Sequence, residues 1–210
     1  NGLKDPDFGF SPDAEFPIIN GEKGNITEYL HFAGENDGAF QLLSFKAGLR
    51  DNMVPESATA TFTANSSLAD LQDKLAAFTS AEGLTAELTQ DGDVYRVTLI
   101  GKSAHGSTPE AGINGATYLA TFLNQFDFAG AAKAYLNVTA NVLHRDFAGK
   151  KLGVAYTDAK MGALSMNAGV FTFDRHSDDN TITLNFRYPQ GTTPQAIKEQ
   201  LETLEGVTCV

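Results

Sequence analysis

A strand–strand–helix pattern that occurs twice is the feature that most constrains the fold of this 210-residue chain. Each copy has two short segments of strand-forming residues, followed by an amphipathic stretch with apolar residues on one helical face. The segments lie at 41–46, 58–62 and 68–78 in the first copy, and at 169–174, 181–187 and 193–204 in the second. The pattern predicts an α+β fold with two related halves, of the ferredoxin-like or lid type, whose helices pack on one face of an antiparallel sheet.

Residues that favour helix starts precede both repeated helices. Ser67 and Asp70 form a capping box, in which the hydroxyl and the carboxylate each satisfy a free backbone amide. Thr193 suits the N-cap position of the second helix, and Pro194 suits its first turn. Between the two copies, the sequence predicts a β-hairpin that turns at Asp91–Gly92. It also predicts two further helices, at about 112–123 and 131–144.

Composition and charge exclude several classes of function. The formal net charge is −11, which argues against nucleic-acid binding, because Lys and Arg must neutralise the phosphates. No run of 18 apolar residues is present, so the sequence predicts no membrane span. Cys209 is the single cysteine, so no internal disulfide can form, and a reducing, cytoplasmic location is expected.

Among the four histidines, His105 has the sequence context of a functional residue. No histidine has a recognised metal-ligand spacing such as His-x-x-x-His, so spacing alone predicts no metal site. His105 lies in residues 101–114, a segment dense in Gly, Ser, Thr and Pro between a predicted strand and a predicted helix. Such junctions present side chains on a rigid scaffold, and an imidazole there could donate to a developing oxyanion. The alternative is a polar loop that caps the next helix.

Several separated motifs resemble those of one family of metalloenzymes. Residues 101–114 (GKSAHGSTPEAGIN) resemble the signature G-x-x-a-H-g-s-x-P-e-x-g-x-N-A, with Gly115 in place of the final alanine. The other motifs are FSPDAEFP at 10–17 with GEKG at 21–24, DNMVPE at 51–56, and NFRYP at 185–189. Taken in chain order, these motifs extend along nearly the whole chain and resemble those of the PepV-like bacterial dipeptidases. These belong to the aminoacylase/carboxypeptidase/dipeptidase superfamily of dinuclear zinc exopeptidases.

The resemblance implies a role for four residues. Asp13 would be a zinc ligand, and carboxylates are suitable zinc ligands. His105 would stabilise the tetrahedral oxyanion. Arg187 would bind the C-terminal carboxylate of the substrate, because its planar guanidinium can grip a carboxylate through two hydrogen bonds. Asn52 would hydrogen-bond the dipeptide backbone. Without the resemblance, Asp13 would be read as a solvated loop residue, Arg187 as a surface charge and Asn52 as a turn residue.

The resemblance also implies that the chain is one part of a larger enzyme. The chain begins with Asn1 rather than Met, and residues 206–210 are typical of the opening of a strand, so both ends are expected to be cut. Residues 1–24 would be a remnant of the catalytic domain with a linker strand. Residues 25–210 would be the lid that caps the substrate, with room for a division into two subdomains near 145–160.

Most of the family's metal ligands are absent from this sequence. The parent reaction requires two zinc ions, held through a His-x-Asp motif, a Glu-Glu pair and a further histidine, and neither motif occurs here. Asp13 alone cannot hold zinc tightly, because a catalytic site needs about three protein ligands. We therefore expect a zinc-dependent dipeptidase as the parent, acting on dipeptides with a free C-terminus. The 210-residue chain by itself is expected to be inactive.

Two other functions remain open from the sequence. The first is an acyl-amino-acid deacylase of the same superfamily. The second is a non-catalytic α+β module for oligomerisation, since the equivalent domain pairs two subunits in shorter relatives. Two similar halves within one chain would mimic that pairing internally, so a monomer is expected.

Overall fold

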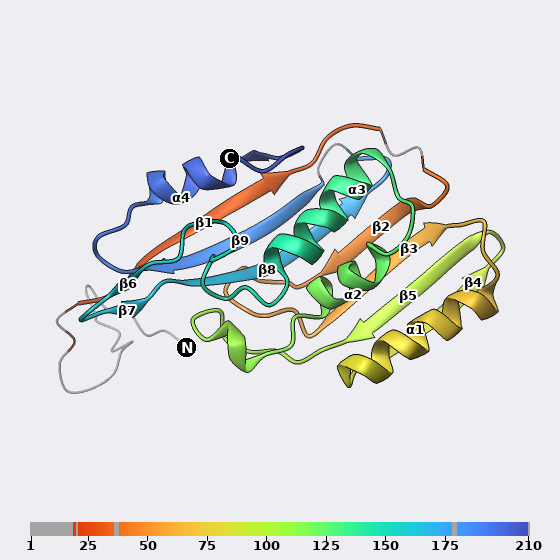
Figure 1. Ribbon diagram of the computed structural model, residues 1–210, viewed down its shortest axis with the longest axis horizontal. Helices are drawn as coiled ribbons and strands as arrows, with labels where there is room; N and C mark the ends of the chain where they lie inside the picture. Colours follow the sequence, from red (N-terminus) through yellow and green to blue (C-terminus); the bar gives the residue numbers. More distant parts are fainter. Residues whose placement is uncertain (1–18, 20, 36–37, 178–179, 210) are drawn as a thin grey trace, which may run out of the picture.

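The computed structural model describes residues 19, 21–35, 38–177 and 180–209. Eight strands in this part of the chain form one sheet in the order β10-β1-β9-β8-β2-β3-β5-β4 (Figure 1). Every pair of neighbours is antiparallel, which confirms the predicted α+β class and the antiparallel sheet. The strands are β1 (Gly24–His31), β2 (Gln41–Ala47), β3 (Ser57–Thr63), β4 (Thr85–Asp91), β5 (Val94–Ile100), β8 (Ser165–Asp174), β9 (Thr181–Tyr188) and β10 (Thr208–Cys209). A separate ribbon pairs β6 (Thr157–Asp158) with β7 (Gly162–Ala163).

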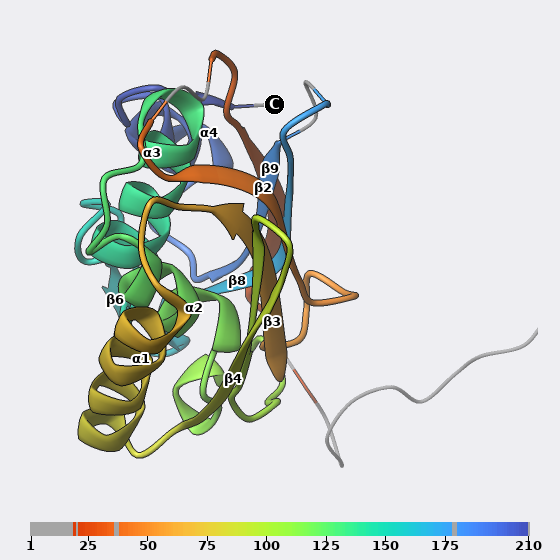
Figure 2. The same ribbon diagram turned by 90° about the vertical axis from the view of Figure 1, so that its right-hand side faces the viewer.

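The α-helices of the described residues lie on one face of the sheet. They are α1 (Leu68–Glu82), α2 (Gly115–Leu123), α3 (Gly130–Asn137) and α4 (Pro194–Leu201). Figure 2 views the sheet edge-on and shows these helices together on one side, with no helix on the other. We call this other side the helix-free face. In the described part of the chain, no helix has the length and apolar character needed to span a membrane.

Both predicted strand–strand–helix units are present. The first is β2-β3-α1 and the second is β8-β9-α4, and the sheet is continuous because β2 pairs with β8 where the two units meet. A common origin of the two units, and a division near 145–160, stay predictions.

Aromatic side chains fill much of the core between the helices and the sheet. The ring of Tyr135, from α3, packs edge-on against Phe32, Phe45 and Phe173, with ring centroids 5.1 to 5.7 Å apart. All four side chains are buried. Because each ring buries a large apolar area, this cluster fixes α3 on the sheet.

In the described part of the chain, the predicted N-caps begin two helices, but no hydrogen bond from the Ser67 amide to the Asp70 carboxylate completes the predicted capping box. The Ser67 hydroxyl accepts a hydrogen bond from the amide of Asp70 at 3.1 Å, and the Thr193 hydroxyl accepts one from the amide of Ala196 at 3.2 Å. The helix expected from 112 begins instead at Gly115. The reason is local: Pro109–Ala111 forms a 3₁₀ turn, and the side chain of Asn114 then caps α2.

The helix expected at 131–144 changes its character halfway. The α-helical part, α3, ends at Asn137, and Val138–Leu143 continues as a π-helix, η2. This widened turn ends before His144, whose Nδ1 lies 3.1 Å from the Thr117 hydroxyl of α2. Periodicity alone does not separate the two helix types, because both place apolar residues on a buried side.

Strand β1 was not predicted, although it lies between β9 and β10 in the sheet. Its residues alternate, with Ile26 and Leu30 toward the core, but Glu28 occupies the apolar position between them. Glu28 is buried in the structure, and burial raises the pKa of its carboxyl group, while Lys198 acts to lower it. A charged residue at that position hid the strand pattern. Most of residues 1–24, expected as the catalytic-domain remnant with its linker strand, lies outside the described residues.

Candidate functional site

Two loops meet beside the helix-free face of the sheet. One connects β2 to β3 through residues 48–56, and the other connects β5 to α2 through residues 101–114. Figure 2 shows the first loop, in orange, extending from the sheet on the side without helices. Met53 and His105 form an antiparallel bridge between the loops. The Val54 amide of the first loop donates to the carbonyl of Ala104 in the second loop at 2.8 Å. The Gly106 amide of the second loop donates to the carbonyl of Asn52 in the first at 2.7 Å.

His105 is exposed, and the structure fixes which of its ring nitrogens carries the proton. The backbone amide of Ser107 donates to Nδ1 at 3.2 Å, and the Ser107 hydroxyl lies 2.7 Å from the same nitrogen. Because Nδ1 accepts a hydrogen bond from a backbone amide, the hydrogen-bond network assigns the proton of the neutral ring to Nε2. No residue in the described part of the chain bonds Nε2. The imidazole therefore presents an N–H donor for an external acceptor.

Asn52 is half-buried at the tip of the first loop, and its backbone is held from two sides. Its carbonyl accepts a hydrogen bond from the Gly106 amide at 2.7 Å. The carbonyls of its neighbours, Asp51 and Met53, both accept from the side-chain amide of Asn167, at 2.7 and 3.0 Å. Within the described residues, no partner bonds the Asn52 side chain. Its amide is therefore available to donate to and accept from a ligand.

Arg187 lies near the end of β9 and is half-buried. Its cross-strand neighbours are Asn25 on β1 and Ser165 on β8. In the described part of the chain, the buried Nε atom has no hydrogen-bond partner, and no carboxylate lies within ion-pair distance of the guanidinium. A partly buried cation without a counter-ion is electrostatically suited to an external anion, and a guanidinium suits a carboxylate.

A row of polar side chains on the helix-free face connects Arg187 to the Asn52 loop. We define this polar row by its members: Asn25, Thr27, Ser165, Asn167, Asn185 and Arg187. Strand register pairs them across β1, β9 and β8, and the alternating residues between them, such as Phe186 and Met166, point into the core. The amide of Asn185 donates to the Thr27 hydroxyl at 3.1 Å, and that hydroxyl donates to the Asp51 carboxylate at 2.6 Å. The row therefore ties β9 and β1 to the loop that carries Asn52.

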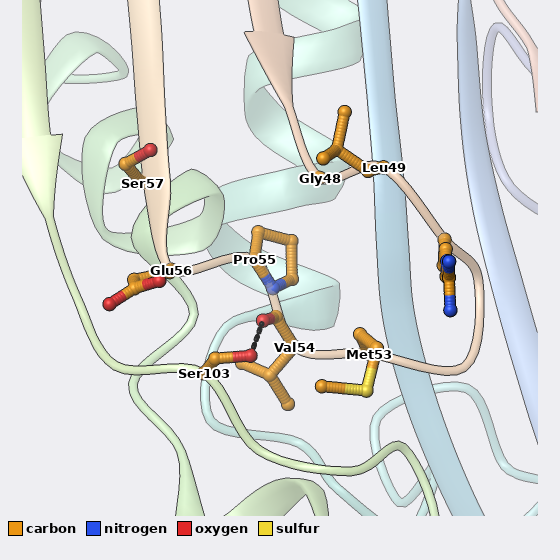
Figure 3. A pocket seen from close by; sticks show the side chains of 9 residues that line it. Gly48, Leu49, Met53, Val54, Pro55, Glu56, Ser57 and Ser103 are labelled. Carbon is orange, nitrogen blue, oxygen red and sulfur yellow. Dashed lines mark hydrogen bonds between the residues drawn. The ribbon is translucent and has the colours of Figure 1, made fainter.

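A hollow of about 470 Å³ lies next to this arrangement (Figure 3). Its lining combines residues of the first loop with Ser103 of the second, whose hydroxyl donates to the carbonyl of Val54 at 3.2 Å. Met53 lines the hollow and also bridges to His105, so the hollow borders the proposed site. Leu49 at its rim is 98% exposed.

No metal centre can be built from the described residues alone. Within them, no group of three or more His, Cys, Asp or Glu side chains lies close enough together to hold a metal ion. Asp13, the zinc ligand expected from the sequence, lies outside the described residues. Of the other histidines, His144 faces α2, and its pKa is lowered to about 4 by burial first and by Arg145 and Lys151 second.

Comparison with known proteins gives a consistent result. Over 209 residues, 96% of the chain, the sequence is 41% identical to the Beta-Ala-Xaa dipeptidase of Lactobacillus delbrueckii subsp. lactis. This chain is similar to dipeptidases. Two Staphylococcus aureus proteins, from strains MRSA252 and bovine RF122, carry the name "putative dipeptidase" and are each 32% identical over 89% of the chain. The chain spans 43% of the length of the first relative and 40% of the other two. No family model matches the chain.

The structure thus brings His105 and Asn52 into one pair of joined loops and places Arg187 on the adjoining polar row. Thr27, Asn167 and Asn185, which connect these three residues, were not predicted from the sequence. One signal was available, because Asn167 and Asn185 interrupt apolar strands at alternate positions, and buried asparagines need partners. The partners themselves could not be predicted, since Asn167 bonds a loop more than 100 residues away.

Proposed function

We propose that this chain is the lid of a zinc-dependent dipeptidase that hydrolyses dipeptides with a free C-terminus. The similarity to the Beta-Ala-Xaa dipeptidase over 96% of the chain supports the reaction class. The lid role of this chain is supported by one observation, which concerns three side chains that can bind a substrate. The Nε2–H of His105, the side-chain amide of Asn52 and the guanidinium of Arg187 each lack a partner among the described residues, and joined loops and strands hold all three.

Each group suits one part of a dipeptide. Arg187 would bind the C-terminal carboxylate, because a guanidinium offers parallel N–H donors to two carboxylate oxygens. Asn52 would bond the peptide backbone, since an amide both donates and accepts. His105 would donate from Nε2 to the carbonyl oxygen as negative charge develops on it during attack by water. Its Nδ1 is already engaged by Ser107, so the ring does not need to reorganise before it donates.

Zinc dependence is part of the proposal, but the described residues do not form a zinc site. The metal ligands would therefore come from other residues, with Asp13 among them. We accordingly expect the 210-residue chain with added zinc to leave β-alanyl-alanine unhydrolysed. Turnover above the buffer background would contradict the lid assignment.

The decisive experiment uses the longer protein that we propose contains this chain, assayed on β-alanyl-alanine. Changing His105→Ala should lower kcat by about 10²–10³, the typical effect of losing one oxyanion donor. His176→Ala is the matched control, because His176 is also exposed but follows the far end of β8. An unchanged kcat in His105→Ala would refute the oxyanion role. Faster hydrolysis of N-acetyl-alanine than of the dipeptide by the wild type would instead identify an acyl-amino-acid deacylase.

A further inference from the structure

Asn167 holds the backbone on both sides of Asn52. It lies on β8, and its side-chain nitrogen donates to the carbonyls of Asp51 and Met53 at 2.7 and 3.0 Å. Because the two N–H groups of an amide have a fixed angle between them, they set the positions of both carbonyl oxygens together. The residue between these carbonyls is Asn52, whose side chain has no hydrogen-bond partner among the described residues. A change at Asn167 must therefore alter where the Asn52 side chain points.

The same side chain also lies against the His105 loop. Gly106 donates its amide to the Asn52 carbonyl at 2.7 Å. A Cβ at Gly106 would lie 3.0 Å from that carbonyl group and 3.2 Å from the Asn167 side-chain nitrogen. Any larger residue at this position would have to push these groups apart by a few tenths of an ångström. The carbonyls of residues 51, 52 and 53 are thus all fixed, two by Asn167 and one by the residue that follows His105.

Fold stability alone does not account for an asparagine at this position. Asn167 is 1% exposed, and its Oδ1 is buried without a hydrogen-bond partner among the described residues. A buried acceptor without a partner destabilises a fold, so the Oδ1 of Asn167 lowers the stability of the protein. Its two donors, by contrast, are both used, and both are directed at the loop that carries Asn52.

The polar row extends this arrangement to Arg187. Asn167 pairs in register with Asn185, which lies two residues before Arg187 on the same face of β9. Asn185 reaches the Asp51 carboxylate through the Thr27 hydroxyl, so the loop is tied to β9 as well as to β8. The distance between Asn52 and Arg187 is therefore set through two routes, of which Asn167 is the direct one.

We propose that Asn167 is a positioning residue, which sets the Asn52 side chain in register with Arg187 for binding of the dipeptide. This inference rests on the function proposed above. It assigns to Asn167 no contact with the substrate, and its effect on turnover passes through Asn52.

The test is a double-mutant cycle in the longer protein with β-alanyl-alanine as substrate. Asn167→Asp keeps the shape of the side chain but turns the donors toward Asp51 and Met53 into an acceptor. We expect kcat/KM to fall about 10- to 100-fold, as is typical when a contacting group is displaced by about 1 Å. In an Asn52→Ala background, the same change should cost less than about threefold, because residues that act through one another are not additive.

The matched control is Asn180→Asp, which changes a buried asparagine at the opposite end of the β8–β9 pair. It should leave kcat/KM within about twofold of the wild type. If Asn167→Asp unfolds the protein, Asn167→Ala replaces it, since alanine adds no repulsion. An effect of Asn167 that is equally large with and without Asn52 would overturn the proposal, and so would an unchanged kcat/KM in a folded variant.

Hydrogen exchange in the 210-residue chain separates failure of this inference from failure of the proposed function. The Gly106 and Val54 amides should exchange about tenfold faster in Asn167→Asp than in the wild type, because both join the two loops. The amide of Val97, a fully buried residue of β5, serves as the internal reference. Unchanged exchange at Gly106 would refute the positioning role even if the longer protein proved not to be a dipeptidase.

Discussion

The packing of the Asn52 loop on β8 depends on the absence of a side chain at Gly169. A Cβ at that position would lie 2.7 Å from both the Cα and the carbonyl carbon of Asp51 and nearer still to its oxygen. Ordinary van der Waals contact begins about 0.7 Å further out, so Gly169→Ala must push the Asp51 backbone away from the strand by roughly 1 Å. The Asn167 nitrogen lies 2.7 Å from the Asp51 carbonyl, so this shift takes the pair beyond hydrogen-bond distance.

The cost follows from these two effects. Overpacking a well-filled site destabilises a protein by about 1–3 kcal/mol, and one lost hydrogen bond adds about 1 kcal/mol. We therefore expect Gly169→Ala to lower the free energy of unfolding by about 2–4 kcal/mol, equivalent to a fall in Tm of roughly 5–10 °C for a chain of this length.

Urea denaturation followed by circular dichroism measures this change on the 210-residue chain. Gly21→Ala is the control, since no atom lies within 4 Å of a Cβ built there and its φ is not in the left-handed region. The control should stay within about 0.5 kcal/mol of the wild type. A Gly169→Ala variant equally close to the wild type would show that the loop does not rest on β8 as described.

Two further changes test the charges of the molecule. Arg187→Lys in the longer protein should raise KM for β-alanyl-alanine by about tenfold with a smaller effect on kcat, because an ammonium cannot copy the two-bond grip on a carboxylate; an unchanged KM would remove Arg187 from the carboxylate site. For His144, the pKa of about 4 in the folded chain lies below the usual 6.5, so the folded state binds fewer protons than the unfolded state. This contribution to stability is complete above pH 6.5 and is lost as the pH falls toward 4. Since the ring is only partly buried, we expect a loss of about 1–2 kcal/mol, reduced for solvent screening. His144→Gln should flatten this part of the stability profile measured by urea denaturation, and a profile identical to that of the wild type would exclude His144 as its source.

Elements defined by local chemistry were predictable from the sequence. The caps at Ser67 and Thr193 and the hairpin between β4 and β5 each involve residues within a few positions of one another, so the sequence contains the whole interaction. The hairpin turns at Gly92–Asp93, one residue later than predicted. The candidate residues His105, Asn52 and Arg187 came from motifs, and the structure adds what motifs lack: the proton position on the ring and the groups left without partners.

Features that depend on distant partners were not predictable. The buried carboxyl of Glu28 disguised β1, because it lies near Lys198 of α4, which is 170 positions away. The change from α- to π-helix at Val138 was not predicted either, and the π-helical segment lies against α2. The partners of Asn167 could not be predicted from the sequence, because they are two backbone carbonyls that any residues at 51 and 53 would supply.

The position of β1 in the sheet also has a consequence for the order of folding. Residues 24–31 pair with β9 and β10, which lie some 150 to 180 positions later in the chain. During synthesis, the antiparallel neighbours β2, β3, β4 and β5 can assemble soon after they are made, since their partners are close in sequence. β1 must wait until residue 188 has emerged, with the apolar side chains of Leu30 and Phe32 uncovered in the meantime. The first of these strands to be made is thus among the last to be completed, and the delay prolongs the time for which its apolar side chains can contact other chains.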